Sequence, residues 1–363
     1  MKNVFVAATR QNDGKTMVSL GMFHEFCKRF SKVAYMKPVG QQYRIIDGEK
    51  IDKDAVLMQQ TYNLADNLSD MSPIAVPRGF TSNYIRKGER HKLVDRVSNS
   101  YQRLSDGKDF VLIEGTGHAG VGSVFDMSNA DTAKLLDAKV VIVTLGGIGR
   151  PIDEIMLNKA VFESKGVELL GVVINKVNPH KLEKVSKIVS RGLKRFGIRL
   201  FGVVPLVQNL SRPSVAELVE DLGGELLSGN DNTLRNTVGK FIIGDMQPHA
   251  AVETFTNNTL LIVPGNRDGI IVTALYESLL DAQKKCNVAG MVFTDGTRPP
   301  LKIMRLINRS NIPVMLVNGD SFSVATKINN SIFKLRAEET EKIQISQSLV
   351  EEHVDIDQIC ELL

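Results

Sequence analysis

The stretch that decides the fold is VFVAATRQNDGKT, residues 4–16, in which a short apolar run leads through a polar loop into Gly-Lys-Thr. A segment with the spacing of an amphipathic helix follows at once, over residues 15–30. A loop that joins a buried strand to a helix N-terminus offers unpaired backbone N–H groups and the positive end of the helix dipole, and both favour phosphate. The stretch therefore predicts a strand, a phosphate-binding loop and a helix.

The side chains of this loop fit a nucleotide. Lys15 would bring a positive charge to the β- and γ-phosphates, and the Thr16 hydroxyl would reach Mg²⁺. The usual pattern, Gly-x-x-x-x-Gly-Lys-Thr, begins with a glycine, where this sequence has Thr9. The plain alternative is a helix start without a ligand, but the strand before and the helix after favour a nucleotide loop. We therefore expect nucleotide binding by Thr9, Gln11, Asn12, Asp13, Gly14, Lys15 and Thr16.

The theme of strand and helix recurs along the first two hundred residues. Apolar, β-rich runs occur at residues 3–8, 32–36, 110–114, 140–145, 169–175 and 200–204. Uninterrupted apolar runs are typical of strands that helices cover on both faces of a parallel sheet. We therefore predict a doubly wound, mainly parallel α/β domain whose ligand site lies beyond the carboxyl ends of the strands.

A polar segment with Pro205 and Pro213 interrupts this theme, and we expect a domain boundary near residue 210. Four shorter apolar runs follow, at residues 241–243, 260–263, 289–293 and 314–317, with helical segments between them. These runs predict a second, smaller α/β domain. We assign residues 1–210 to the phosphate-loop domain and residues 211–363, with helices at 338–347 and 349–363, to the second domain.

Two carboxylates are candidates for a metal site beside the loop. Glu114 ends the apolar strand at residues 110–114, where a buried acid is costly unless it is paired or solvated. Phosphate-loop proteins commonly place a Mg²⁺-binding acid at such a strand end. Asp54 begins an expected helix, and on its own it is more typical of a helix N-terminal charge than of a ligand.

Five motifs in order resemble the dethiobiotin synthetase family, the related cobyrinic acid amide synthases and the N-terminal part of long bacterial phosphate acetyltransferases. The motifs are Ala8-Thr9 through Gly14-Lys15-Thr16, Met36-Lys37-Pro38-Val39, Asp54-Ala55, Leu112-Ile113-Glu114-Gly115-Thr116-Gly117 and Gly171-Val172-Val173-Ile174-Asn175. The resemblance implies a P-loop NTPase fold in which Thr16, Asp54 and Glu114 gather around Mg²⁺. It also implies that Lys37 contacts the γ-phosphate and the acceptor group, and that the protein is a homodimer.

The residues at the end of the strand at 169–175 indicate which nucleotide base the protein binds. The sequence Asn175-Lys176-Val177-Asn178 is similar to the guanine-reading motif Asn-Lys-x-Asp, but its last residue is an amide. Without a carboxylate to accept from the guanine ring N–H and amino group, selection of guanine is lost. We therefore expect ATP as the nucleotide, and the resemblance places Asn175 against adenine; the alternative is that Asn175 only starts a turn.

The second domain resembles the small domain named after its Asp-Arg-Thr-Gly-Gly motif, which follows the phosphate-loop domain in phosphate acetyltransferases. The matching stretch is Ile262-Val263-Pro264-Gly265-Asn266-Arg267-Asp268-Gly269. Asn266 departs from the pattern, because that family usually has aspartate there. Loops after these strands are plausible ligand sites, and well-capped connections are an equal alternative.

Other departures bear on the activity. Dethiobiotin synthetases hold the acceptor groups with small hydroxyl residues where this sequence has the larger Gln11 and Gln41. The acetyltransferase domain of the phosphate acetyltransferases is a further C-terminal segment, so we do not expect that activity from this chain. Arg10 stands where related proteins place a charge-neutralising lysine, and we predict that it stabilises transition-state charge; a solvated loop arginine is the alternative.

Composition narrows the class of protein. The 363 residues are 43% hydrophobic and 24% charged, with a net charge of +4, which is ordinary for globular domains. Three scattered cysteines, Cys27, Cys286 and Cys360, give neither a disulfide framework nor a metal site. Acidic and basic residues alternate, and no run is long enough for a membrane helix. We expect a cytoplasmic protein with no nucleic-acid partner and no membrane partner.

Two functions follow from these residues. The first is an ATP- and Mg²⁺-dependent enzyme of the ligase or synthetase type, which phosphorylates a small carboxylate or carbamate for attack by an amine. In this reading Lys15, Lys37 and Arg10 are the catalytic residues, and no covalent nucleophile is needed. The alternative is an ATP-sensing regulatory module, which the missing acceptor hydroxyls favour.

Overall fold

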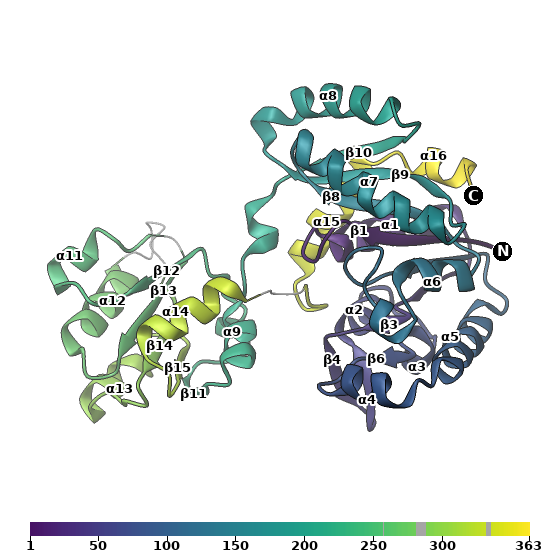
Figure 1. The fold of residues 1–363 in the computed structure, drawn as a ribbon. Coiled ribbons are helices and arrows are strands. Elements are labelled where there is room, and N and C mark those ends of the chain that lie inside the picture. Colours follow the sequence, from purple (N-terminus) through teal and green to yellow (C-terminus); the bar gives the residue numbers. More distant parts are fainter. Residues whose placement is uncertain (257, 281–287, 332–334) are drawn as a thin grey trace. The chain divides into compact units, whose positions relative to one another are not determined.

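The computed structural model describes residues 1–256, 258–280, 288–331 and 335–363. The chain divides into two compact units, one of residues 1–210 and 334–363 and one of residues 211–333 (Figure 1). Within the described residues, no helix combines the length and the apolar composition that crossing a membrane requires.

The first unit is built on a six-stranded sheet in the order β10-β9-β8-β1-β7-β2, and every neighbouring pair is parallel. The strand at residues 110–114 is buried along its whole length, and its neighbour is buried from Val4 to Ala8, as uninterrupted apolar runs require when helices cover both faces. This arrangement confirms the doubly wound α/β fold. The strands are β1 (Lys2–Ala8), β2 (Val33–Met36), β7 (Phe110–Glu114), β8 (Lys139–Leu145), β9 (Leu169–Val177) and β10 (Leu200–Pro205).

The strand order reverses at β1, which places the site. Its neighbours β7 and β8 both follow it in the chain, and β2 lies beyond β7. In open α/β sheets, ligands bind in the crevice that such a reversal leaves at the carboxyl ends of the strands. The loops that leave β1 and β7 therefore meet at one edge of the sheet, and these loops carry the phosphate-loop motif and Glu114.

Helices and short strands complete the first unit. The strand pairs are β3 (Val39–Gly40) with β6 (Ile74–Ala75) and the hairpin of β4 (Tyr43–Ile46) with β5 (Glu49–Asp52). The helices before the second unit are α1 (Lys15–Arg29), α2 (Lys53–Tyr62), α3 (Leu68–Met71), α4 (Phe80–Lys87), α5 (Arg90–Ser105), α6 (Asn129–Leu135), α7 (Gly149–Ser164) and α8 (Leu182–Lys194), with 3₁₀ turns η1 (Ser123–Phe125), η2 (Pro179–Lys181) and η3 (Gln208–Ser211).

The two C-terminal helices, α15 (Thr340–His353) and α16 (Ile356–Glu361), belong to the first unit. This differs from our expectation that they would complete the second domain. Their apolar residues join the core under the six-stranded sheet, and these are Ile343, Leu349, Val350, Val354, Ile356 and Ile359. The second unit is thus an insertion in the first, since burial rather than chain order decides where a helix packs.

Helix α15 packs against α1, the helix that begins at the phosphate loop. The two helices come so close at Gly21 that a Cβ atom there would lie 2.4 Å from Val350 Cγ2 and 2.8 Å from the Ser346 carbonyl oxygen. Gln347 of α15 also donates to the Tyr62 hydroxyl, and that hydroxyl donates to the Leu20 carbonyl oxygen. The C-terminal segment therefore braces the middle of α1 and the C-terminal end of α2.

The second unit has a five-stranded sheet in the order β11-β15-β14-β13-β12. Four strands are parallel, and β11 (Glu225–Ser228) runs antiparallel to β15. Two apolar clusters, one on each face, pack the sheet between helices. The remaining elements are β12 (Lys240–Ile243), β13 (Thr259–Pro264), β14 (Val288–Thr294), β15 (Val314–Leu316), α9 (Val215–Leu222), α10 (Asp231–Leu234), α11 (Pro248–Val252), α12 (Asp268–Leu280), α13 (Leu301–Ile307) and α14 (Ser321–Asn330).

Replacing Gly21 tests the packing of α15 on α1. Alanine at an open helical position stabilises by about 1 kcal/mol relative to glycine. At Gly21 the added methyl group meets the backbone of α15, so Gly21→Ala should instead destabilise the first unit by roughly 1–3 kcal/mol in thermal or urea unfolding. The matched control is Gly149→Ala in α7, where an added Cβ atom meets nothing within 4 Å. Equal stability of the two variants would contradict this packing.

Candidate functional site

The phosphate loop turns at Gly14, which has a left-handed backbone with φ of 89°. A Cβ atom at Gly14 would lie 2.2 Å from Asn175 Nδ2, so this position requires glycine for space as well as for conformation. Asn175 is fully buried, donates to the Asp13 carbonyl oxygen at 2.9 Å and accepts from the Lys176 backbone N–H at 2.8 Å. The end of β9 therefore holds the loop that leaves β1.

Asp13 organises the loop from within. Its Oδ2 accepts from the Thr9 hydroxyl at 2.7 Å and from the Arg10 backbone N–H at 2.8 Å. Its Oδ1 is buried and has no hydrogen-bond partner among the described residues, and burial raises the pKa of this carboxyl. On the outer side of the loop, Lys176 Nζ donates to the Asn12 carbonyl oxygen at 2.8 Å.

Lys15, the first residue of α1, is a buried cation that has no close anionic partner among the described residues. Only 8% of the residue is exposed, and within the described part of the chain its ammonium group makes no hydrogen bond or ion pair. Burial and the nearby Lys37 ammonium lower the pKa of Lys15 to about 8, although Glu114, Asp54 and Asp13 act in the opposite direction. An anion at the N-terminus of α1 would supply the missing partner.

The three predicted metal ligands meet beside the loop. Glu114 Oε1 accepts from the Thr16 hydroxyl at 3.0 Å and from Lys37 Nζ at 2.9 Å, and Glu114 Oε2 accepts from the Tyr35 hydroxyl at 3.0 Å. Asp54 Oδ2 lies 2.8 Å from the same Lys37 Nζ. Glu114, Asp54 and Lys37 are each at most 4% exposed. The structure thus brings Thr16, Asp54 and Glu114 together around the Lys37 ammonium.

These groups fit Mg²⁺. The described residues contain no group of three or more His, Cys, Asp and Glu side chains that could enclose a metal by themselves. Mg²⁺ seldom needs such a cage, since it usually keeps several waters and binds one or two carboxylates together with substrate phosphates. Two buried carboxylates and the Thr16 hydroxyl next to a phosphate loop suit that coordination.

Two residues that our sequence reasoning missed support this cluster. Asp52 is fully buried and caps α2, because its Oδ1 accepts from the Asp54 backbone N–H at 2.9 Å. Tyr35 fixes Glu114 from β2, and burial together with the Glu114 carboxylate raises the pKa of Tyr35 well above its ordinary value. A polar hydroxyl in the otherwise apolar run VAYM was the available signal for Tyr35.

Two of the predicted site residues, Arg10 and Gln11, have protein partners that limit their roles. Arg10 forms an ion pair with Glu154 of α7, which also accepts from Arg150 Nε at 2.9 Å. Gln11 Nε2 donates to Gln41 Oε1 at 3.0 Å. The two amides that replace the hydroxyl residues of dethiobiotin synthetases therefore lie against each other.

Asn175 and Asn178, the residues used in the argument about the base, form hydrogen bonds with backbone groups in this structure. Both ends of the Asn175 side-chain amide contact protein, at the Asp13 carbonyl and the Lys176 N–H. Asn178 accepts from the His180 N–H at 3.0 Å and caps η2. A contact of Asn175 with adenine stays a prediction.

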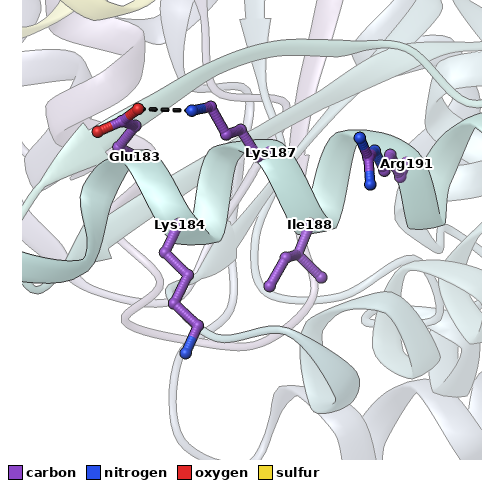
Figure 2. Close-up of a pocket in the computed structure, with 5 residues that line it drawn as sticks. All are labelled: Glu183, Lys184, Lys187, Ile188 and Arg191. Atoms are coloured by element: carbon purple, nitrogen blue, oxygen red, sulfur yellow. Dashed lines mark hydrogen bonds and ion pairs between the residues drawn. The ribbon is translucent and has the colours of Figure 1, made fainter.

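A separate surface hollow of about 430 Å³ lies along α8 and contains none of these residues. Figure 2 shows Lys184 and Ile188 extending to the same side of the helix, while Glu183 and Lys187 pair at 2.6 Å. The opposite side of α8 is buried, so the charged side chains form the solvated face of an amphipathic helix. The hollow is lined by Glu183, Lys184, Lys187, Ile188 and Arg191.

Comparison with known families decides the class. The sequence profile of the family AAA_26, described as an AAA domain, matches residues 2–214. This chain belongs to the AAA_26 family. A second profile, that of the DRTGG domain, matches residues 217–331, which lie in the inserted unit. The two matches support the predicted phosphate-loop domain followed by a DRTGG domain.

The curated relatives include proteins named phosphate acetyltransferase. Those of Nitratidesulfovibrio vulgaris and Synechocystis sp. are each 26% identical to this AAA_26 chain over 97% of its length and 50% of their own. That of Pseudomonas putida is 24% identical over 98% of this chain and 51% of its own length. The chain therefore spans about half the length of these curated relatives.

Solved structures show more distant likenesses. The MinC:MinD cell division complex of Aquifex aeolicus has a TM-score of 0.38 and 14% identity, covering 58% of this chain and 84% of that chain. MinD of Pyrococcus horikoshii with Mg-ADP has a TM-score of 0.36 and 13% identity, covering 58% and 83%. The CBS and DRTGG domains of Clostridium perfringens pyrophosphatase, complexed with diadenosine tetraphosphate, have a TM-score of 0.28 and 15% identity, covering 46% and 83%.

The unpaired Lys15 ammonium should reduce the stability of the free protein. Replacing it with methionine, which is of similar size and uncharged, should stabilise the ligand-free chain by roughly 1–3 kcal/mol at pH 7. Because the pKa of Lys15 is about 8 in the folded protein and the ordinary lysine value is 10.5, the gain should be full below pH 8 and should shrink as the pH rises towards 10.5.

Urea unfolding of wild type and Lys15→Met between pH 6 and 10 measures this difference. The exposed Lys187 serves as the control, since Lys187→Met removes only a surface ion pair and should change stability little. A Lys15→Met variant that is less stable than wild type at every pH would show that the Lys15 ammonium has a partner.

Proposed function

We propose that the first unit binds ATP with Mg²⁺ and that the chain is an ATP-sensing regulatory module related to the N-terminal part of phosphate acetyltransferase. One observation carries this proposal: the Lys15 ammonium lies buried at the N-terminus of α1, with no hydrogen bond or ion pair among the described residues. A cation is stable in such a place when an anion arrives to pair with it. The terminal phosphates of a nucleotide are the anions that a loop of this form accepts.

In this proposal each part of the site has a defined task. Lys15 and Lys37 balance the charge of the terminal phosphates, and Thr16, Asp54 and Glu114 hold Mg²⁺. The bound metal would supply further positive charge to the same phosphates. Backbone groups from Thr9 to Gly14 would line the phosphates, since the contacts of Asp13 fix the loop before any ligand binds. Adenine would lie near the end of β9, beside Asn175.

Three observations favour sensing over turnover. The hydrogen bond between Gln11 and Gln41 occupies the place where the resemblance puts acceptor groups, so a small substrate would have to separate these amides. Arg10 forms an ion pair with Glu154, so it would have to leave this partner before it could stabilise charge on a phosphoryl group. The relatives named phosphate acetyltransferase, which align with nearly the whole chain over about half of their length, favour this reading over a dethiobiotin synthetase-like ligase. The homodimer is part of this proposal.

Nucleotide-dependent thermal stabilisation tests the binding. ATP with Mg²⁺ at a hundredfold excess over its dissociation constant should raise the unfolding temperature of the first unit by on the order of 5–10 °C. Lys15→Met should lose this shift although the free variant is more stable, whereas Lys187→Met should keep it. ATP should also stabilise more than GTP. A full shift in Lys15→Met would remove the phosphate-loop assignment.

Phosphoryl transfer is the second candidate, and the cluster of Lys37 with Asp54 and Glu114 favours it. The same groups that bind Mg²⁺-ATP could stabilise a phosphoryl group in transfer to a carboxylate or carbamate, as in the dethiobiotin synthetases. Arg10 would then have to leave Glu154 to add its charge.

Phosphate release separates the two candidates. We expect release from Mg²⁺-ATP to stay slow when small carboxylates and amines are added, because Gln11 and Gln41 obstruct the acceptor position. The double variant Gln11→Ser with Gln41→Ser should keep ATP binding. Stimulation of wild type by a carboxylate, lost in Lys37→Met, would establish the transfer reaction instead.

A further inference from the structure

The Lys37 ammonium occupies the centre of the acidic cluster. Its Nζ lies 2.8 Å from Asp54 Oδ2, 2.9 Å from Glu114 Oε1 and 3.1 Å from the Gly115 carbonyl oxygen. Burial alone would lower the pKa of Lys37, but the Asp54 and Glu114 carboxylates raise it above its ordinary value. Lys37 is therefore charged and is the direct counter-ion of both acids.

Glu114 has little freedom to turn away from this arrangement. Tyr35 donates to Oε2, so Oε1 is the oxygen that faces Thr16 and Lys37. Asp54 is held by its place in the first turn of α2, which Asp52 caps. The carboxylate oxygens that suit a metal are thus the oxygens that Lys37 already contacts.

Electrostatic repulsion determines whether the Asp54 and Glu114 oxygens can bind a metal ion while they contact Lys37. A second cation beside Asp54 and Glu114 would face the Lys37 ammonium at short range in a buried place, where repulsion between like charges is strong. The Lys37 ammonium cannot leave alone, since a buried cation needs an anion. Nucleotide phosphates would provide that anion at the adjacent loop.

We propose that Lys37 is the resident counter-cation of the metal-free site and that it couples metal binding to nucleotide binding. This inference rests on the proposed function. In the free protein Lys37 holds Asp54 and Glu114 in position and disfavours a divalent cation. When phosphate takes the Lys37 ammonium, the two carboxylates become available, so the metal binds well only together with the nucleotide. Lys37 is in this respect a positioning and gating residue.

Metal titration without nucleotide tests the inference directly. Mn²⁺ is the probe, since its bound and free forms are distinguished by electron paramagnetic resonance. Lys37→Met should bind Mn²⁺ alone at least tenfold more tightly than wild type, because the ammonium group that repels a second cation beside Asp54 and Glu114 is removed. Lys37→Arg, which keeps the charge, should bind as weakly as wild type.

Lys15→Met is the matched control, because it removes a buried positive charge from the same site without freeing a carboxylate contact. Its gain in Mn²⁺ affinity should be much smaller than that of Lys37→Met. Equal gains in the two variants, or no gain in either, would overturn the inference. If Lys37→Met is too unstable to purify, Lys37→Gln is used, with the same expected order of affinities.

A second titration, with ATP present, measures the coupling. Wild type should bind Mn²⁺ at least tenfold more tightly with ATP than without, and Lys37→Met should show a clearly smaller increase. An equal increase in both would contradict the coupling by Lys37. Failure of wild type to bind ATP at all would instead defeat the proposed function, so the two failures are distinguishable.

Discussion

The buried positive charge of Lys15 is the feature on which the rest of this site depends. The Lys15 ammonium, at the start of α1, makes no hydrogen bond or ion pair in the described part of the chain, and its pKa is lowered to about 8. Most structural lysines avoid this cost by reaching solvent or a carboxylate. The loop keeps Lys15 in this buried place because its own conformation is fixed. Gly14 permits the tight turn, and Asn175 of β9 donates a hydrogen bond to the loop. A reduced free energy of unfolding in the ligand-free protein is expected at a site built to bind an anion.

The second cation, Lys37, forms ion pairs with two carboxylates, whereas Lys15 forms none among the described residues. This difference separates the roles of the two lysines. Lys37 pairs with both Asp54 and Glu114, so the two carboxylates proposed to hold the metal are already in position before any ligand binds. Lys15 has no such partner within the described residues and so remains available to an anion. Helix α15 returns from the inserted unit to brace α1 and α2, the helices that carry Lys15 and Asp54.

How far the sequence predicts this structure depends on whether the signal is local. The motif at residues 4–16 and the apolar runs predict the parallel sheet and the loop, because both follow from neighbouring residues. Asp54 and Lys37 needed the family resemblance, since nothing beside them in the sequence points to Glu114. The placement of α15 could not be read, because its partner Gly21 lies more than three hundred residues earlier.

The most direct measurement is the pKa of the Lys15 ammonium, followed by NMR in protein labelled at the lysine side chains and assigned with Lys15→Met. The account predicts a pKa near 8 in the free protein and a clear rise towards the ordinary lysine value when ATP and Mg²⁺ are added. A Lys15 pKa of about 10.4 in the free protein, unchanged by ATP, would contradict it.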